Sequence, residues 1–426
     1  MQISAKTTAV ASPAAGKPFI SRWSIPLAGL VLTLMGGVAY AWGVYVVPLQ
    51  ERFGWSRSEA MLPMSIHLMV FTTVGMIYGG VLQDKFGPRK VPAAGGVLFL
   101  IAYLMMTQIH RFPYTWWLVL TYGIVGGLAN GLAYCAAIPA ARKWFPDKTA
   151  LAVAMSVTGF GLAATIFAPW ITRLIRTVGI EQTFLTVGIV VFVFIMIGAW
   201  VMRLPPQGWV PPGWEGIQPG SSAAMYAPRT EATLGEAIRS PLFHTMWIGY
   251  FCIIFAGLMA MAHVVPYGIS ILGMERPAAA LAAVFFGLAN GFGRPLAGLI
   301  AEKTGPMKVM FVVYSIAGVT FLLFNTIART PITLYISAFI FGCLFATTLG
   351  LLPVLTTVGF GVKNLGAIYG ALKTAFGLAA FFGPMAAAWA YDVTGTYVVP
   401  FAGAGVLVLV GLVIYVFGLR IKYKMP

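Results

Sequence analysis

The sequence carries one motif twice, as GVLQDKFGPRK from Gly80 to Lys90 and as GLIAEKTGPMK from Gly298 to Lys308. The copies begin at residues 80 and 298 of a 426-residue chain, so they are separated by about half its length. An acidic residue, a lysine, a glycine, a proline and a final lysine keep their positions in both copies. A repeat at this spacing predicts two halves with the same architecture.

Long apolar segments flank both copies and recur along the whole chain. Of its residues 59% are hydrophobic and 9% charged, and the mean hydropathy is +0.88. Apolar runs of about twenty residues cross a bilayer as helices, whereas the short alternating segments of a membrane barrel are absent. We therefore predict an all-α membrane protein, with twelve transmembrane helices in two pseudo-symmetric six-helix bundles. The predicted spans are 24–47, 60–82, 91–109, 115–140, 150–174, 182–203, 243–271, 277–301, 307–327, 331–356, 365–390 and 396–418.

The basic residues of the loops set the expected orientation. With both termini on the cytoplasmic side, eighteen Lys and Arg fall in cytoplasmic segments and seven on the other side. This asymmetry is typical of inner (plasma) membrane proteins, and it accounts for the net charge of +16 without nucleic acid as a partner. The lipid bilayer is therefore an expected partner. We also expect a small solute as the second partner and a protein that acts as a monomer.

A Pro/Gly/Ser-rich stretch divides the chain near its middle. PPQGWVPPGWEGIQPGSS, residues 205–222, is followed by the polar, helix-like segment TLGEAIRSP, residues 233–241. The predicted organisation is a flexible cytoplasmic tail (1–22), an N-terminal six-helix bundle (23–203), a cytoplasmic linker (204–241), a C-terminal six-helix bundle (242–419) and a second cytoplasmic tail (420–426).

Two basic residues fall inside predicted spans. Arg294, in ANGFGRPLAG, lies eight or nine residues from the charged end of its span, roughly 12–14 Å at the helical rise. Lys373 lies ten residues beyond Lys363, about 15 Å by the same rise, so both cations reach a similar depth and can converge. A buried arginine costs at least about 2.5–3.5 kcal/mol and normally faces a cavity or a partner.

No acidic residue is predicted at the depth of these cations. All eleven lie in loops or at span ends, which disfavours a buried ion pair as the explanation of Arg294 and Lys373. The favoured counter-charge is an anionic substrate, and the alternative for Lys373 is a side chain that extends to place its ammonium at the membrane border. A guanidinium matches the two oxygens of a carboxylate, and an ammonium adds a compact second charge.

The doubled motif resembles the signature loops between helices 2 and 3, and 8 and 9, of the major facilitator superfamily. This resemblance covers nearly the whole chain and implies two bundles around a central cavity that opens to each side in turn. It also implies a conformational latch at the cytoplasmic ends of the helices, formed by Asp84, Arg89 and Glu302.

GVAYAWGVYVVPL (37–49), NGFGRPLAG (290–298) and ALKTAFG (371–377) are similar to segments of the oxalate:formate antiporter family and the related monocarboxylate transporters. The resemblance implies that Arg294 anchors a carboxylate and that Lys373 makes a second anion contact or couples charge. Asn290 shares the helix face of Arg294. Further cavity residues are expected to be Tyr40, Tyr134, Phe345, Tyr267 and His263. Ala39, Phe345 and Leu349 replace a glutamine, a tryptophan and a tyrosine of the oxalate-exchange pattern, which favours a looser, more apolar pocket.

These features predict a secondary transporter of lactate- or pyruvate-like monocarboxylates that moves a proton with its substrate. Carboxylate exchange of the oxalate:formate type is the alternative, and proton-coupled export of other organic compounds is a third. His67 and His263 lie within spans and are candidate proton carriers, although a membrane histidine more often serves only as a hydrogen-bonding group. The sequence has no P-loop, HExxH or nucleophile elbow, so neither an enzyme nor a cofactor or metal site is predicted. Cys135, Cys252 and Cys343 lie in apolar segments and predict no disulfide.

Overall fold

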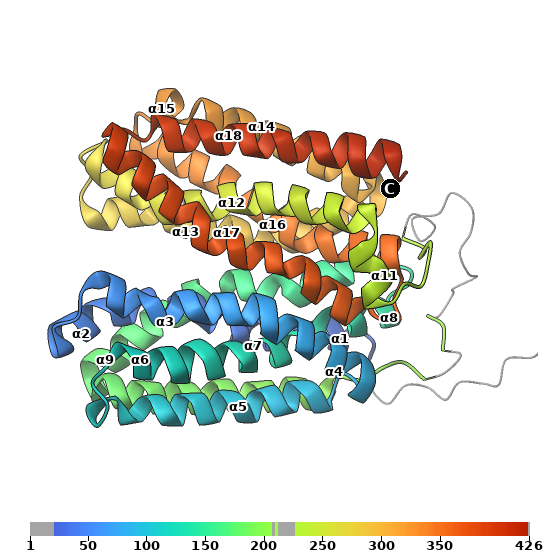
Figure 1. The fold of residues 1–426 in the computed structure, drawn as a ribbon, viewed down its shortest axis with the longest axis horizontal. Helices are drawn as coiled ribbons and strands as arrows, with labels where there is room; N and C mark the ends of the chain where they lie inside the picture. Colours follow the sequence, from blue (N-terminus) through green and yellow to red (C-terminus); the bar gives the residue numbers. More distant parts are fainter. Residues whose placement is uncertain (1–20, 207–208, 212–225, 425–426) are drawn as a thin grey trace, which may run out of the picture.

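The computed structural model describes residues 21–206, 209–211 and 226–424. The predicted N-terminal tail lies almost wholly outside this range. In the described part the chain is helical, without strands, and forms two bundles that lie side by side (Figure 1). The first bundle contains α1 Ser24–Gly36, η1 Gly37–Ala41, α2 Gly43–Phe53, α3 Arg57–Val70, η2 Phe71–Gly75, α4 Met76–Phe86, α5 Lys90–Met106, η3 Thr107–His110, α6 Thr115–Leu118, η4 Val119–Gly126, α7 Gly127–Tyr134, α8 Ala137–Trp144 and α9 Thr149–Val201.

The second bundle follows the linker and repeats the long antiparallel helices of the first. The linker contains α11 Leu234–Arg239. The elements of the second bundle are α12 Pro241–Ser270, α13 Arg276–Thr304, α14 Pro306–Leu322, α15 Phe324–Ile327, α16 Pro331–Phe360, α17 Leu365–Thr394, α18 Val398–Val413 and η5 Ile414–Lys422. Prolines at the first helical positions of α12, α14 and α16 start these helices, because the missing N–H there has no helical partner to lose.

The described residues account for twelve membrane spans. Ten helices are long and apolar enough to cross a bilayer, and α9 among them contains two spans that meet at Gly179, where φ is 80°. The 17-residue helix α14 is the twelfth. Several helices extend beyond the predicted spans: α16 ends at Phe360 and α17 at Thr394, each four residues later than predicted, whereas α14 ends at Leu322, five residues before the predicted end at 327.

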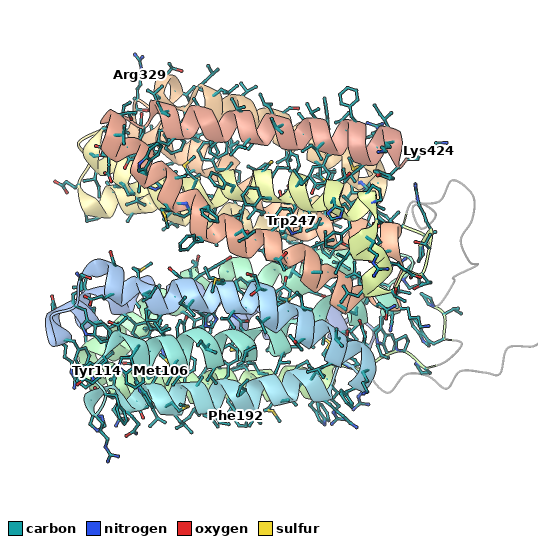
Figure 2. All side chains as sticks on the ribbon, viewed as in Figure 1. Met106, Tyr114, Phe192, Trp247, Arg329 and Lys424 are labelled. Atoms are coloured by element: carbon teal, nitrogen blue, oxygen red, sulfur yellow. The ribbon has the colours of Figure 1, made fainter. Side chains whose placement is uncertain are left out.

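One end of the molecule, here called the linker face, carries residues 226–240 and both copies of the repeated motif (right in Figure 1). The other end is called the opposite face. Arg329 and Tyr114 are labelled at the opposite face in Figure 2, and Lys424 is labelled at the linker face. The predicted polar helix of the linker is α11, and Thr233 and Glu236 form a capping box at its start. Hydrogen bonds from the backbone N–H and hydroxyl of Thr233 lower the pKa of the Glu236 carboxyl.

The two bundles contact each other closely in the half of the membrane near the linker face. A Cβ built on Gly80 of α4 would lie 2.3 Å from the carbonyl carbon of Gly366 in α17. A Cβ on Gly298 of α13 would lie 2.8 Å from the carbonyl oxygen of Ala150 in α9. Glycine at these two crossings therefore lets backbones from different bundles touch. The linker face is closed in this structure.

Candidate functional site

A cleft of about 470 Å³ separates the bundles on the side of the opposite face. Residues of η1, α2 and α3 line one wall, and residues of α12 and α17 line the other. None of its described lining residues is charged: they are Tyr40, Trp42, Gly43, Met61, Met64, Ser65, Leu68, Leu258, Met261, Ala262, Ala380, Phe381, Pro384 and Met385. Together with the closed linker face, this cleft shows a structure that is open toward the opposite face.

A second, much smaller cavity of about 10 Å³ lies between the bundles. Its lining consists of Tyr40, Phe71, Tyr134, Phe160, Arg294, Leu349, Lys373 and Phe376. Arg294 comes from α13 and Lys373 from α17, so helices that are far apart in sequence bring both membrane-buried cations to one cavity. This second cavity is here called the central cavity. Tyr40 lines both the central cavity and the open cleft, and therefore lies between the two spaces.

Arg294 is 1% exposed, and hydrogen bonds hold its guanidinium in place. Its Nε and one terminal nitrogen donate to Oδ1 of Asn290, over 3.3 and 2.9 Å. The other terminal nitrogen donates to the carbonyl oxygen of Val157 in α9, which belongs to the first bundle. Asn290, predicted to share a helix face with Arg294, thus orients the guanidinium, while α9 supplies a neutral acceptor.

Lys373 is buried as well, and its Nζ is surrounded by aromatic rings. It lies 4.6 Å from the ring centroid of Phe376, 5.7 Å from that of Tyr134 and 5.9 Å from that of Tyr369. Ring faces attract a cation, but they do not neutralise it. The ion pairs of the described residues are Arg22–Asp147 and Arg52–Glu181, and neither includes Arg294 or Lys373.

The structure places four of the predicted site residues outside the lining of the central cavity: Asn290, Phe345, Tyr267 and His263. Phe345 packs behind that lining, against Phe286 and Phe376. Tyr267 donates to the carbonyl of Ala328 near the opposite face, and His263 bonds the carbonyl of Pro384 through Nε2 over 3.0 Å. Phe345 and Tyr267 are buried, and His263 is partly exposed. Because α12 and α16 are apolar on every side, their sequences do not indicate which side meets the cavity.

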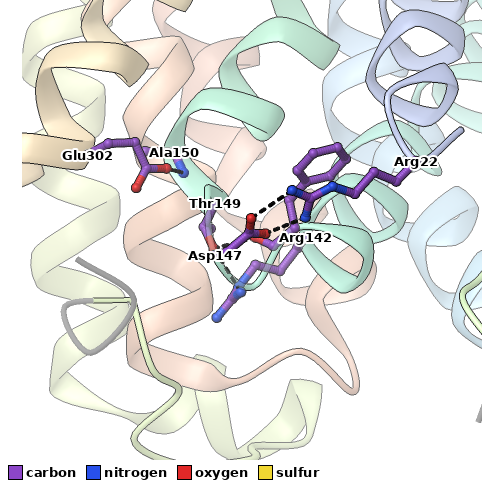
Figure 3. Close-up of polar contacts among 7 residues, drawn as sticks. Arg22, Arg142, Asp147, Thr149, Ala150 and Glu302 are labelled. Carbon is purple, nitrogen blue, oxygen red and sulfur yellow. Dashed lines mark hydrogen bonds and ion pairs between the residues drawn. The ribbon is translucent and has the colours of Figure 1, made fainter. Parts of the chain in front are cut away.

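Asp84 and Glu302, the acidic residues of the repeated motif, occupy corresponding positions at the linker face. Oδ2 of Asp84 accepts from the backbone N–H of Ala367 at the start of α17, over 3.3 Å. Oε1 of Glu302 accepts from the N–H groups of Ala150 and Leu151 at the start of α9, and the contact with Ala150 is drawn in Figure 3. Each carboxylate therefore binds the positive end of a helix from the other bundle. Arg89 is exposed and forms no ion pair within the described residues.

Sequence reasoning missed a third buried cation at the linker face. Arg142, which lies just beyond the predicted span 115–140, is 6% exposed. It donates to Thr149 over 2.8 Å (Figure 3) and to the carbonyl of Tyr226 over 2.7 Å. The hydroxyl of Tyr226 in turn donates to the carbonyl of Ala301 in α13 over 2.6 Å. The linker thus connects α8 of the first bundle to α13 of the second, and no local sequence signal reveals a contact made across 84 positions.

Phe71, Phe160 and Phe376 were also missed as lining residues of the central cavity. Phe71 and Phe160 stack with ring centroids 5.6 Å apart, and Tyr134 meets both rings edge-on. In a chain with thirty phenylalanines, these three carry no signal that separates them from core residues. The cavity thus has two basic side chains and five aromatic rings in its described lining, and its volume of about 10 Å³ leaves room for about one water molecule, so a larger solute enters only when the lining side chains move apart.

Comparisons with known proteins agree with the two-bundle architecture. Solved structures with the same fold include the fucose:proton symporter of E. coli, with a TM-score of 0.69 at 13% identity over 92% of this chain and 98% of that one. A proton:xylose symporter matches with a TM-score of 0.67 at 18% identity, over 93% and 95% of the two chains. At these identities the likeness concerns the fold alone.

The sequence comparisons are more specific. An oxalate:formate antiporter of Oxalobacter formigenes is 30% identical over 72% of this chain and 70% of its own length. Monocarboxylate transporter 13 of Rattus norvegicus is 24% identical over 91% and 87% of the two chains.

Two helical bundles, closed toward one face and open toward the other around a central cavity, define a membrane transport protein. The Major Facilitator Superfamily model matches residues 27–384 and 246–425. The chain belongs to the Major Facilitator Superfamily.

Proposed function

We propose that this transporter carries small monocarboxylates of the lactate and pyruvate type, by alternating access and together with a proton. One observation supports the proposal above all. Arg294 and Lys373 are buried on the same cavity, and no carboxylate appears in its described lining. Two uncompensated cations are costly inside a membrane, so an anion that binds between them has a large electrostatic advantage over a neutral or cationic solute.

The contacts of the site residues support a role for each of them in this proposal. Arg294 presents donors from a guanidinium that Asn290 already orients, so little freedom is lost when a carboxylate binds. A carboxylate there competes with the Val157 carbonyl for one terminal nitrogen. Lys373 supplies the second charge, while Tyr40, Tyr134 and Leu349 contact the body of the substrate. Leu349, where the oxalate-exchange pattern has tyrosine, favours a methyl-bearing substrate over flat, doubly charged oxalate.

Carboxylate exchange is the second candidate, and the antiporter from Oxalobacter formigenes favours it. The contacts of the two histidines inside the spans bear on the choice between proton symport and exchange, because these histidines are the candidate proton carriers. His67 has both ring nitrogens bonded inside the first bundle, and His263 bonds the carbonyl of Pro384. Neither histidine lines either cavity. In the symport mechanism the negative charge of the substrate compensates the positive charge of the proton, so a singly charged anion and one proton together move no net charge.

The proposed orientation places the linker face in the cytoplasm of a cell bounded by an inner (plasma) membrane. The excess of basic residues on that face supports this choice. The protein acts as a monomer with both termini cytoplasmic, and Asp84 and Glu302 hold the cytoplasmic ends together while the cleft faces outward.

Substrate choice is tested by counterflow in proteoliposomes with labelled formate, lactate, pyruvate and oxalate. We expect lactate and pyruvate to exchange at least about threefold faster than oxalate at equal concentration, because Leu349 stands where the oxalate-exchange pattern has a tyrosine. Lactamide, which has the shape of lactate without its charge, is the matched negative control. Competition by oxalate that exceeds competition by lactate would contradict the monocarboxylate assignment.

Symport and exchange differ in what they do to the lumenal pH. With a lactate gradient and no internal anion, we expect uptake that acidifies the lumen, and a protonophore prevents the acidification without stopping the uptake. Uptake that occurs only when the vesicles are preloaded with a carboxylate, with no change in lumenal pH, would favour exchange instead. A pH-sensitive dye trapped inside the vesicles distinguishes the two results.

A further inference from the structure

Three helices of the first bundle are irregular, and a buried polar cluster joins them. Helix α1 gives way to the 3-10 segment η1 at Gly37, π-helical turns form η2 after α3, and α6 passes into the π-helical η4. His67 of α3 and Asn130 of α7 are both fully buried between these elements. Departures from α-helical bonding leave carbonyl groups that need other donors.

His67 and Asn130 contact one carbonyl in η4 and one at the end of α1. Nδ1 of His67 lies 2.9 Å from the carbonyl oxygen of Tyr122 in η4, and Nδ2 of Asn130 donates to the carbonyl oxygen of Gly36 over 3.0 Å. The same Nδ2 lies 3.0 Å from Nε2 of His67. A continuous set of hydrogen bonds therefore runs from η4 through His67 and Asn130 to the end of α1.

The two carbonyls fix the protonation of the ring. A carbonyl oxygen only accepts, so Nδ1 of His67 carries a hydrogen, and an amide nitrogen only donates, so Nε2 presents a lone pair. The contact with the Gly36 carbonyl likewise fixes the orientation of the Asn130 amide. His67 is thus a neutral imidazole with both nitrogens used, and Oδ1 of Asn130 is buried with no hydrogen-bond partner in the described structure.

This set of bonds ends next to the anion site. Gly36, whose carbonyl Asn130 holds, is the last residue of α1, and Tyr40 lies four residues later within η1. A 3-10 turn rotates successive side chains differently from an α-helical turn, so the point at which α1 changes sets the direction of Tyr40. Tyr122 strengthens the connection, because its ring stacks on His67 and on Trp42 at centroid distances of 4.5 and 4.1 Å.

We infer that His67 is a positioning residue for substrate recognition. Through Asn130 it holds the junction between α1 and η1, and so places Tyr40 between the central cavity and the open cleft. The role rests on the proposed function, because Tyr40 is assigned there to the substrate site. Gly36 is part of the same set of contacts, because a Cβ at this position would lie 2.4 Å from Oδ1 of Asn130 and displace the amide.

The transport test uses His67→Phe, His67→Gln and Gly36→Ala, with His110→Gln as control because His110 is exposed and bonds only the carbonyl of Thr107. We expect His67→Phe and Gly36→Ala to raise the KM for lactate about tenfold and to change the maximal rate less than about twofold. Glutamine at position 67 offers an amide oxygen in place of Nε2, so we expect its KM within about threefold of wild type. An unchanged KM in His67→Phe contradicts the inference.

A double substitution separates positioning from general packing. In a Tyr40→Leu background, His67→Phe is expected to raise KM by less than about twofold more, because the residue through which it acts is gone. Fully additive effects overturn the inference, since they mean that His67 acts independently of Tyr40.

A measurement without substrate tests the role of His67 independently of which solute the protein carries. In a protein whose three cysteines are replaced, Tyr40→Cys is labelled by a small maleimide added from the opposite face. We expect His67→Phe to change the labelling rate at least about fivefold, whereas His110→Gln leaves it unchanged. Equal rates overturn the inference. If wild-type protein carries no carboxylate, the proposed function fails, but the labelling rates still decide the role of His67.

Discussion

Carboxylate counterflow falls at least about a hundredfold when Arg294 is replaced by alanine. Removing one partner of a buried, charge-assisted contact costs roughly 3–5 kcal/mol, and each 1.4 kcal/mol is a factor of ten. Lysine at position 294 keeps the charge but not the planar pair of donors, so we expect an intermediate loss of about tenfold. The rates are measured in proteoliposomes with labelled lactate at matched protein density.

The control for this substitution is Arg52→Ala. Arg52 forms an ion pair with Glu181 at the opposite face, and its side chain is 45% exposed. Exposed pairs contribute no more than about 1 kcal/mol, so transport should change less than about fivefold. If Arg294→Ala shows the wild-type counterflow rate and both variants fold correctly, Arg294 does not belong to the substrate site.

Valine in place of Gly80 is expected to abolish the state seen in this structure. Its side chain would have to occupy space within 2.3 Å of the Gly366 backbone, so α4 and α17 cannot meet and the linker face cannot close. Lactate uptake should fall at least about tenfold. A cysteine introduced at Met61 in the open cleft should react more slowly with a maleimide added from the opposite face, because the cleft is then less often open.

Gly403→Val is the matched control, since a Cβ at Gly403 meets no atom within 4 Å. It should leave both uptake and labelling within about twofold of wild type. If Gly80→Val transports normally and labels at the wild-type rate, the crossing of α4 and α17 does not limit closure of the linker face.

The architecture followed from the sequence because its signals were strong and partly redundant. Hydropathy marks each span, and the motif repeated at Gly80 and Gly298 relates the two halves. The depths of Arg294 and Lys373 followed from the helical rise alone. The prediction that they share a cavity also depends on which sides of α13 and α17 face the interior of the protein. The charges indicate these sides, because a cation is unfavourable in contact with lipid.

The rest of the site depends on contacts that leave no local pattern. His263 and Tyr267 lie on a helix that is apolar on all sides, so no periodicity shows which way they face. Arg142 is buried by Tyr226 from the linker, and His67 meets Asn130 from 63 positions away. Such groups became visible only when their hydrogen-bond partners were known.

The central claim is that Arg294 and Lys373 form one anion site, and ligand-dependent thermal unfolding tests it without requiring transport. A ligand at a hundred times its Kd stabilises the folded protein by about 2.7 kcal/mol. We predict that lactate raises the Tm of the wild-type protein, that lactamide does not, and that Arg294→Ala and Lys373→Ala each lose the lactate effect. Equal stabilisation of wild type and both variants by lactate would contradict the claim.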